Sequence, residues 1–225
     1  ITKTYEQIDF NDIENFDPKE IIEEKYLIKN KLIVNSQRGN LLNELKLSME
    51  ECRNFYFSVA FINYSGLQLL LDCFKNAKDR GVRGKIIAST YLNFTEPKAL
   101  ERIKGFDNID LKIFIADKEQ GFHTKAYIFE NEDNYKIIIG SSNITQRALK
   151  SNVEWHVMII SKKETDFVNE VLEEYNSIYD ETGFVNDEFL DKYKIFIRTL
   201  RKREKDNTAD FSEYEIIKPN LMQKR

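Results

Sequence analysis

The chain has 225 residues, of which 41% are hydrophobic and 32% are charged, and its formal net charge is −4. This length suffices for one sizeable hydrophobic core. No apolar run is long enough to span a bilayer and no signal peptide opens the chain, so we expect no membrane partner. Two cysteines, Cys52 and Cys73, lack metal-ligand spacing. They argue against a zinc site or a disulfide framework and favour a cytoplasmic protein.

The first half of the chain alternates between apolar strands and amphipathic helices. Residues 1–24 are acidic and weakly patterned, and residues 25–34 have strand character. Leu41, Leu42, Leu45 and Met49 then share one face of a helix over 38–52. Strands are predicted at 54–62, 83–90 and 109–116, and helices at 65–81 and 95–105. This alternation predicts parallel strands joined by right-handed helical crossovers.

The pattern changes after residue 116. Residues 122–130 and 135–141 are apolar strands separated by Asn-Glu-Asp-Asn, which predicts a hairpin. A polar connection leads to a strand at 153–160 and an amphipathic helix at 162–180. We therefore expect an α/β fold, with a mixed β-sheet flanked by helices on both faces.

One of the two histidines stands beside a lysine in a predicted strand. Strand alternation places His123 and Lys125 on the same face, where the two groups together favour an anion such as phosphate. Gly140, Ser141, Ser142 and Asn143 close the next strand of the hairpin. The glycine permits a close backbone approach, and the three polar side chains are hydrogen-bond donors for non-bridging phosphate oxygens.

Glu154 lies on the opposite face from Val153, Trp155 and Val157, and a glutamate there needs a partner. We expect it to accept the Nδ1 proton of His123, which would leave Nε2 free to attack. Taken singly, each of these features has an ordinary structural explanation. Their combination, in this order, predicts a phosphate-processing site.

The His-x-Lys, Gly-Ser-x-Asn and downstream Glu pattern resembles the phospholipase D superfamily. In that family the motif is His-x-Lys, four residues, Asp, six residues and Gly-Ser-x-Asn, and nuclease-like members carry an acidic residue on the following strand. His123, Lys125, Gly140, Ser141 and Asn143 match it, and Glu154 matches the acidic position. The Asp position holds Glu130 instead, and nine residues rather than six separate it from Gly140.

The resemblance implies a metal-independent phosphodiester hydrolase. His123 would form a covalent phosphohistidine, while Lys125, Asn143 and Ser141 hold the oxygens on which charge develops. A second histidine would protonate the leaving oxygen. Because this chain has one copy of the motif, a homodimer sharing one active site would supply it; His156 is the rival within the chain. No cofactor or metal is implied.

Sequence similarity over residues 35–180 extends to domains that precede bacterial superfamily 2 helicases and to the nuclease of a metal-independent restriction endonuclease. This implies DNA as the partner. Candidate substrate-binding residues are Ser142, Arg147, Lys150 and Tyr91. The basic segment 191–205 would meet phosphates or form a solvated helix face.

Pro219 and Gln223 resemble the start of a helicase motor, in which a glutamine reads adenine. We therefore expect an arm and first strand at 1–34, the phospholipase-D-like domain at 35–180, and a helical, basic linker to a C-terminal helicase domain at 181–225. ATP would serve only that motor. The alternative is a non-catalytic nucleic-acid-binding or dimerisation module of a helicase. A phospholipase would need a second motif copy.

Overall fold

The computed structural model describes residues 29–36, 39–117 and 121–210. The predicted arm at 1–24 and the residues Pro219 and Gln223 lie outside the described residues. The elements are β1 (Lys29–Val34), α3 (Leu41–Glu51), β2 (Asn54–Val59), α4 (Tyr64–Leu67), α5 (Leu71–Asp79), β3 (Arg83–Ser89), η1 (Tyr91–Asn93), α6 (Pro97–Lys104), β4 (Ile109–Phe114), β5 (Lys125–Glu130), β6 (Asn134–Gly140), α7 (Gln146–Lys150), β7 (Trp155–Lys162), α8 (Asp166–Glu181), β8 (Gly183–Phe184) and α9 (Asp187–Asp210).

The strands form one mixed sheet in the order β1-β7-β6-β5-β2-β3-β4-β8. β2, β3 and β4 are parallel, as the alternation of strands and helices predicts. The neighbours β5, β6, β7 and β1 pair antiparallel in turn. The predicted hairpin joins β5 to β6, and the Asn131 N–H closes it on the carbonyl of Asn134. The expectation of a mixed sheet is confirmed.

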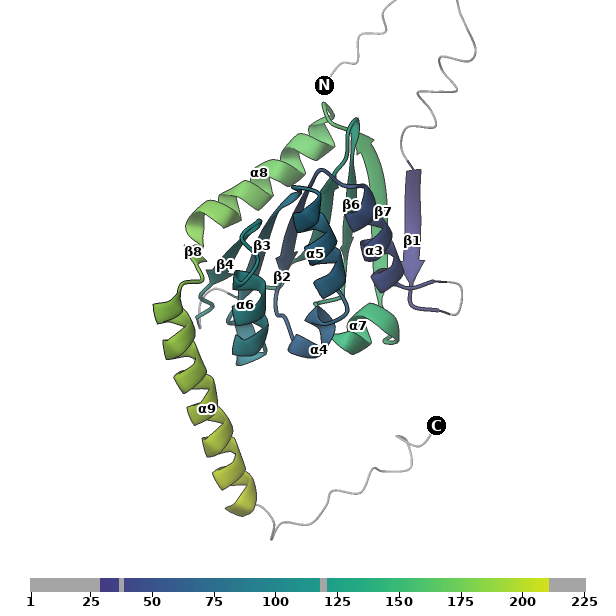
Figure 1. Ribbon diagram of the computed structural model, residues 1–225. Coiled ribbons are helices and arrows are strands. Elements are labelled where there is room, and N and C mark those ends of the chain that lie inside the picture. The colour runs from purple at the N-terminus through teal and green to yellow at the C-terminus, as the bar shows by residue number, and fades with distance from the viewer. Residues whose placement is uncertain (1–28, 37–38, 118–120, 211–225) are drawn as a thin grey trace, which may run out of the picture.

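Helices cover both faces of this sheet (Figure 1). α3 and α5 lie over one face, and their apolar residues join a large core with Phe55, Phe57 and Tyr127 of the sheet. α8 covers part of the other face, where Val168 and Tyr175 pack in a smaller core cluster. A helix on each face buries the apolar side chains on both sides of the central strands.

The predicted helix at 65–81 is divided into α4 and α5. α4 begins after Asn63, not after Ser65. Gly66 lies so close to the backbone of Ile144 and Thr145 that no Cβ would fit, and this contact ties α4 to the segment after β6. Pro97 occupies the first turn of α6 as predicted, while Thr95 donates to the carbonyl of Ser89 (2.6 Å) instead of capping the helix.

Structured residues continue past both predicted limits of the domain. β1, from the segment 1–34, pairs along its whole length with β7. After residue 180, β8 pairs with β4, and α9 packs against α6. Tyr193 of α9 donates to the carbonyl of Thr95 (3.0 Å), and Leu190 and Ile197 are buried in the large core. The first half of α9 is therefore part of the same folded unit as the sheet.

Candidate active site

The predicted motif residues come together at one end of the sheet. β2 and β3 end there, β5 begins there at Lys125 opposite Val59, and β6 ends there at Gly140 opposite His156. The short helices α4 and α7 lie at the same end (Figure 1). The carboxyl ends of parallel strands are where α/β sheets ordinarily place ligands.

His123 precedes β5 instead of lying within it. The predicted strand at 122–130 begins only at Lys125, so His123 is released from the sheet and its side chain is exposed. Its ring makes an edge contact with the ring of Tyr91, with centroids 5.7 Å apart. This places Tyr91, a predicted substrate-binding residue, directly beside the histidine.

Lys125 is buried, with 6% of its surface exposed. Its Nζ donates to the carbonyl oxygen of His123 at 2.8 Å, which leaves two ammonium protons for another acceptor. Burial lowers the pKa of Lys125, while the Glu154 carboxylate acts in the opposite direction. His123 and Lys125 line one cavity of about 500 Å³, together with Ser58 and Gly140.

Asn143 is buried and is held by the main chain after β2. Its Oδ1 accepts the N–H of Phe61 at 3.1 Å, which leaves its Nδ2 amide as a donor. Phe61 was not predicted as a site residue. It holds Asn143 through its backbone N–H, which a residue of almost any type could supply. Ser58 and Thr124 share a hydroxyl hydrogen bond of 2.5 Å beside His123, and they also escaped prediction.

Ser142, which the sequence predicts to bind the substrate, has its polar groups bonded within the protein. It is fully buried, and its Oγ donates to the carbonyl of Ala148 at 3.0 Å. Its own carbonyl accepts the Tyr127 hydroxyl at 2.9 Å. Ser142 thus fixes the turn between β6 and α7, because every one of its polar groups is directed into the protein.

Ser141 and Glu154 form a pair on the exposed side of the site. The Ser141 hydroxyl donates to the Glu154 carboxylate, and the Trp155 N–H donates to Ser141 Oγ at 3.3 Å. The expected bond from His123 Nδ1 to Glu154 is not formed among the described residues, where the Glu154 carboxylate accepts from the Ser141 hydroxyl. Glu154 still acts on the site through its charge, which raises the pKa of Lys125.

His156 is buried at 1% exposure and packs behind the motif. Its Nε2 accepts the N–H of Ser142 at 3.3 Å, and burial lowers its pKa. A Cβ on Gly140 would overlap the His156 ring, so the motif glycine provides the room for this imidazole. His156 is therefore a structural residue and not an accessible second acid.

Arg147 and Lys150 are exposed on α7, which begins three residues after Asn143. Thr145 caps this helix through Ala148 N–H. Glu130, at the Asp position of the motif, lies at the other end of β5. Its carboxylate accepts from Asn54, Tyr56 and Lys163, each at 3.0 Å. This position is a structural anchor in the present chain.

Beside the site, strands β1, β7 and β6 leave apolar side chains exposed. Val157 pairs with Leu32 on one side and Ile139 on the other, and Trp155 pairs with Val34. These five residues, which we call the β7 patch, are between 36% and 67% exposed. A contiguous apolar patch of this kind marks an interaction surface.

Among residues 29–36, 39–117 and 121–210, no three His, Cys, Asp or Glu side chains gather where they could hold a metal ion. Within those same ranges, no helix combines the length and the apolar character needed to cross a membrane.

A family model described as "cardiolipin synthase, PLD-like domain" matches residues 41–179, which is more than half of the chain. Curated proteins gave no significant sequence match. Among solved structures, NucT from Helicobacter pylori has a TM-score of 0.57 at 17% identity, over 70% of this chain and 99% of NucT. Nuc from Salmonella typhimurium, a phospholipase D family member, also has a TM-score of 0.57, at 18% identity over 71% of this chain and 99% of Nuc.

Phosphatidylserine synthase from Haemophilus influenzae gives a TM-score of 0.53 at 13% identity, over 81% of this chain and 47% of that enzyme. At these identities the structural matches show the fold alone, whereas the family model matches the sequence itself. The chain therefore belongs to the family of cardiolipin synthase, PLD-like domains, and its mixed sheet with flanking helices is the phospholipase-D-like fold.

Proposed function

We propose that this chain is a metal-independent phosphodiesterase that cleaves DNA through a phosphohistidine intermediate. The observation that carries the proposal is the joint lining of one cavity by His123 and Lys125 in a chain of this family. His123 is exposed and can reach a substrate, while Lys125 is buried and offers charge in a site of reduced solvation.

In the first step, His123 Nε2 would attack phosphorus and the P–O bond to the leaving strand would break. The leaving oxygen takes a proton from a second histidine. In the second step, that histidine removes a proton from water, the hydroxide attacks phosphorus, and the P–N bond to His123 breaks. Lys125 and the Asn143 amide would stabilise the negative charge on the non-bridging oxygens in both steps. This sequence needs no cofactor.

The second histidine is, in this proposal, His123 of another copy. His156 is buried and bonded to Ser142, so it does not reach the cavity. A two-fold homodimer would place two His123 side chains on one phosphate through a self-complementary interface. The β7 patch is the surface we assign to that interface, since it is apolar, exposed and next to Ser141 and Glu154.

The proposal has two further parts. The substrate is DNA, and the chain is attached to a C-terminal, ATP-dependent helicase in the cytoplasm. They are supported by the resemblance of residues 35–180 to nuclease domains in front of helicases, and by exposed Arg147 and Lys150 on α7. Arginine and lysine beside the reacting phosphate suit contacts with a nucleic-acid backbone.

The test is cleavage of end-labelled single- and double-stranded DNA in excess EDTA by wild type, His123→Ala and Glu173→Gln. Glu173 is exposed on the outer side of α8 and serves as the matched control for contaminating nucleases. Cleavage by wild type and control that is absent in His123→Ala supports the proposal. Equal cleavage by all three proteins contradicts it. DNA binding without cleavage by any of them would favour the non-catalytic recognition module.

The covalent intermediate has its own signature. For a chiral phosphorothioate diester hydrolysed in oxygen-isotope-labelled water, two displacements at phosphorus give net retention of configuration, whereas direct attack by water gives inversion. Retention is the expected result, and inversion would exclude a phosphohistidine.

A further inference from the structure

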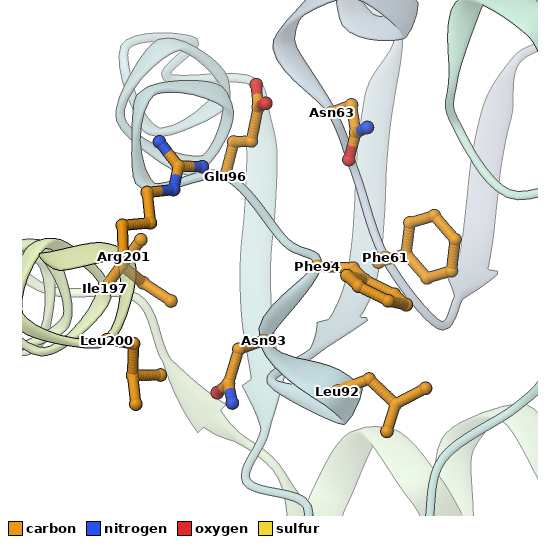
Figure 2. A pocket seen from close by; sticks show the side chains of 9 residues that line it. All are labelled: Phe61, Asn63, Leu92, Asn93, Phe94, Glu96, Ile197, Leu200 and Arg201. Atoms are coloured by element: carbon orange, nitrogen blue, oxygen red, sulfur yellow. The ribbon is translucent and has the colours of Figure 1, made fainter. Parts of the chain in front are cut away.

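A second cavity lies next to the catalytic one and is not used by the reaction described above. Figure 2 shows it between the η1 segment, the residues after β2, and α9. Its volume is about 530 Å³, within the roughly 300–1,000 Å³ typical of small-ligand sites. We infer that this cavity receives an unpaired nucleobase next to the scissile phosphate, which makes single-stranded nucleic acid the substrate class. The inference rests on the proposed function.

The cavity is joined to the catalytic residues through two of its walls. Phe61 lines it, and the N–H of the same residue holds Asn143 at 3.1 Å. Leu92 also lines it and directly follows Tyr91, whose ring contacts His123. A strand whose phosphate lies at His123 and Asn143 would therefore bring a neighbouring base to this cavity.

The walls offer a stacking surface. The rings of Phe61 and Phe94 meet edge to face, with centroids 5.3 Å apart, and Phe94 is 52% exposed. Leu92 beside them is 60% exposed. An aromatic side chain left half in solvent is the usual platform for the bases of a single strand, because every base has a π-face.

The backbone that presents these side chains is strained. Leu92 and Asn93 have φ values of 50° and 58°, in the left-handed region that side chains rarely adopt. Two hydrogen bonds hold the loop in this conformation. The Asn93 N–H donates to the Thr90 carbonyl oxygen at 2.8 Å, and the Tyr91 N–H donates to Ser89 Oγ at 3.0 Å. Strain retained at a loop beside a catalytic residue is typical of a ligand-binding segment.

Polar groups in the cavity suit the edge of a base. Asn63, Asn93 and Glu96 line it, and the Glu96 carboxylate accepts the N–H of Tyr64 at 2.7 Å. Within the described part of the chain, Asn63 Oδ1 is buried without a hydrogen-bond partner. Amide and carboxylate oxygens accept from the amino groups of bases but repel phosphate, so a base fits this part of the cavity better than the backbone does.

The third wall is the basic helix α9. Ile197 and Leu200 face the cavity and Arg201 stands at its rim (Figure 2). Lys194 pairs with Glu101 of α6 at 2.8 Å, which fixes the helix against the domain. Arg198, Lys202 and Arg203 are exposed further along. The basic segment of the sequence thus continues from the base cavity as a path for a polyanion.

The test measures oligonucleotide binding by fluorescence anisotropy in excess EDTA, using the full chain with His123→Ala so that no probe is cleaved. Probes are a labelled oligodeoxycytidylate, whose bases carry an amino group, and a duplex of the same length. Three substitutions are added separately to the His123→Ala protein. They are Phe94→Ala, the conservative Phe94→Tyr, and Phe184→Ala as control. Phe184 is 60% exposed on β8 and belongs to neither cavity.

Phe94→Ala should weaken single-strand binding about tenfold, since stacking on one aromatic ring has an effect of this size. Phe94→Tyr and Phe184→Ala should bind as the background protein does. Duplex binding should change by less than about twofold in all of them, because backbone contacts do not involve the ring. Arg201→Ala should reduce the slope of log affinity against log salt for the single strand by about one.

Equal loss of single-strand and duplex binding in Phe94→Ala, or no loss of either, would overturn the inference. Binding of phosphatidylglycerol vesicles that depends on Phe94, without oligonucleotide binding, would assign the cavity to a lipid and overturn it as well. A separate assay tests the proposed function. If His123→Ala still hydrolyses bis(p-nitrophenyl) phosphate, the proposed function is contradicted. The binding result stands whichever way that assay turns out.

Discussion

Lys125 donates from Nζ to the carbonyl oxygen of His123 over 2.8 Å, so that the two motif residues are joined through the backbone of one and the side chain of the other. Both residues line the same cavity. Because the Lys125 side chain is buried there, its protonation state depends on the few charges around it, of which Glu154 is one.

Glu154→Gln should move the alkaline limit of activity to lower pH. Burial already lowers the pKa of Lys125, so the ammonium loses its proton at a lower pH than an ordinary lysine. The Glu154 carboxylate raises that pKa, and its removal lowers it further. The measurement is the pH profile of kcat/KM for a small phosphodiester, with Glu173→Gln as control. An alkaline limb that stays in place would contradict a charged Lys125 as the phosphate ligand.

Gly140→Ala should destabilise the protein by about 1–3 kcal/mol, the usual cost of forcing extra volume into a packed interior. The new Cβ would overlap the His156 ring and the Trp155 carbonyl. Thermal unfolding measures the effect. Gly183→Ala is the matched control, because a Cβ there meets no atom within 4 Å. Equal melting temperatures for the two variants would show that His156 moves aside at no cost.

The sequence was sufficient to predict the mixed sheet, the parallel strands and the hairpin. Period-two apolar strands and a short polar turn determine these features locally. The partners of Ser142 and Glu154 were not predictable. Ser142 bonds to Ala148, six residues away, and Glu154 to Ser141, thirteen residues away. These pairs depend on the tertiary fold and not on a local sequence pattern.

Two further features were not predicted from the sequence. One is the break between α4 and α5, and the other is the base cavity. The leucine-rich pattern over 65–81 is continuous in sequence, and nothing in it marks the interruption between Leu67 and Leu71. The cavity is formed by α9, about one hundred residues after the η1 segment, so no local pattern could have shown that these two segments meet.

Glu130→Gln should lower stability by about 1 kcal/mol, because three partly buried donors lose a charged acceptor. Burial opposes ionisation of Glu130, but hydrogen bonds from Asn54, Lys163 and Tyr56 hold the pKa of the carboxyl below its usual value. The stabilisation is therefore present above the carboxyl pKa of the unfolded chain, about 4.3, and is lost as the pH falls below it. Urea unfolding at neutral and acidic pH measures this. A difference between wild type and variant that does not shrink on acidification would contradict the assignment.

Val157→Arg should convert the proposed dimer into monomers. Val157 lies in the middle of the β7 patch, between Leu32 and Ile139. In a two-fold interface each substitution occurs twice, and like charges brought together across an interface cost several kcal/mol, so the dimer dissociation constant should rise by about a hundredfold or more. Sedimentation velocity measures the oligomeric state, and Leu47→Arg is the control, since Leu47 is 52% exposed on α3 outside the patch.

Hydrolysis of a small diester by Val157→Arg should fall steeply on dilution and recover at high protein concentration, because a monomer has only one accessible histidine. Leu47→Arg should follow wild type over the same range. Mixing wild type with excess His123→Ala should lower the activity per wild-type chain, since mixed dimers would hold one histidine instead of two. A wild-type protein that sediments as a monomer and hydrolyses the diester at undiminished specific activity would exclude a shared site and require a proton donor from within the chain.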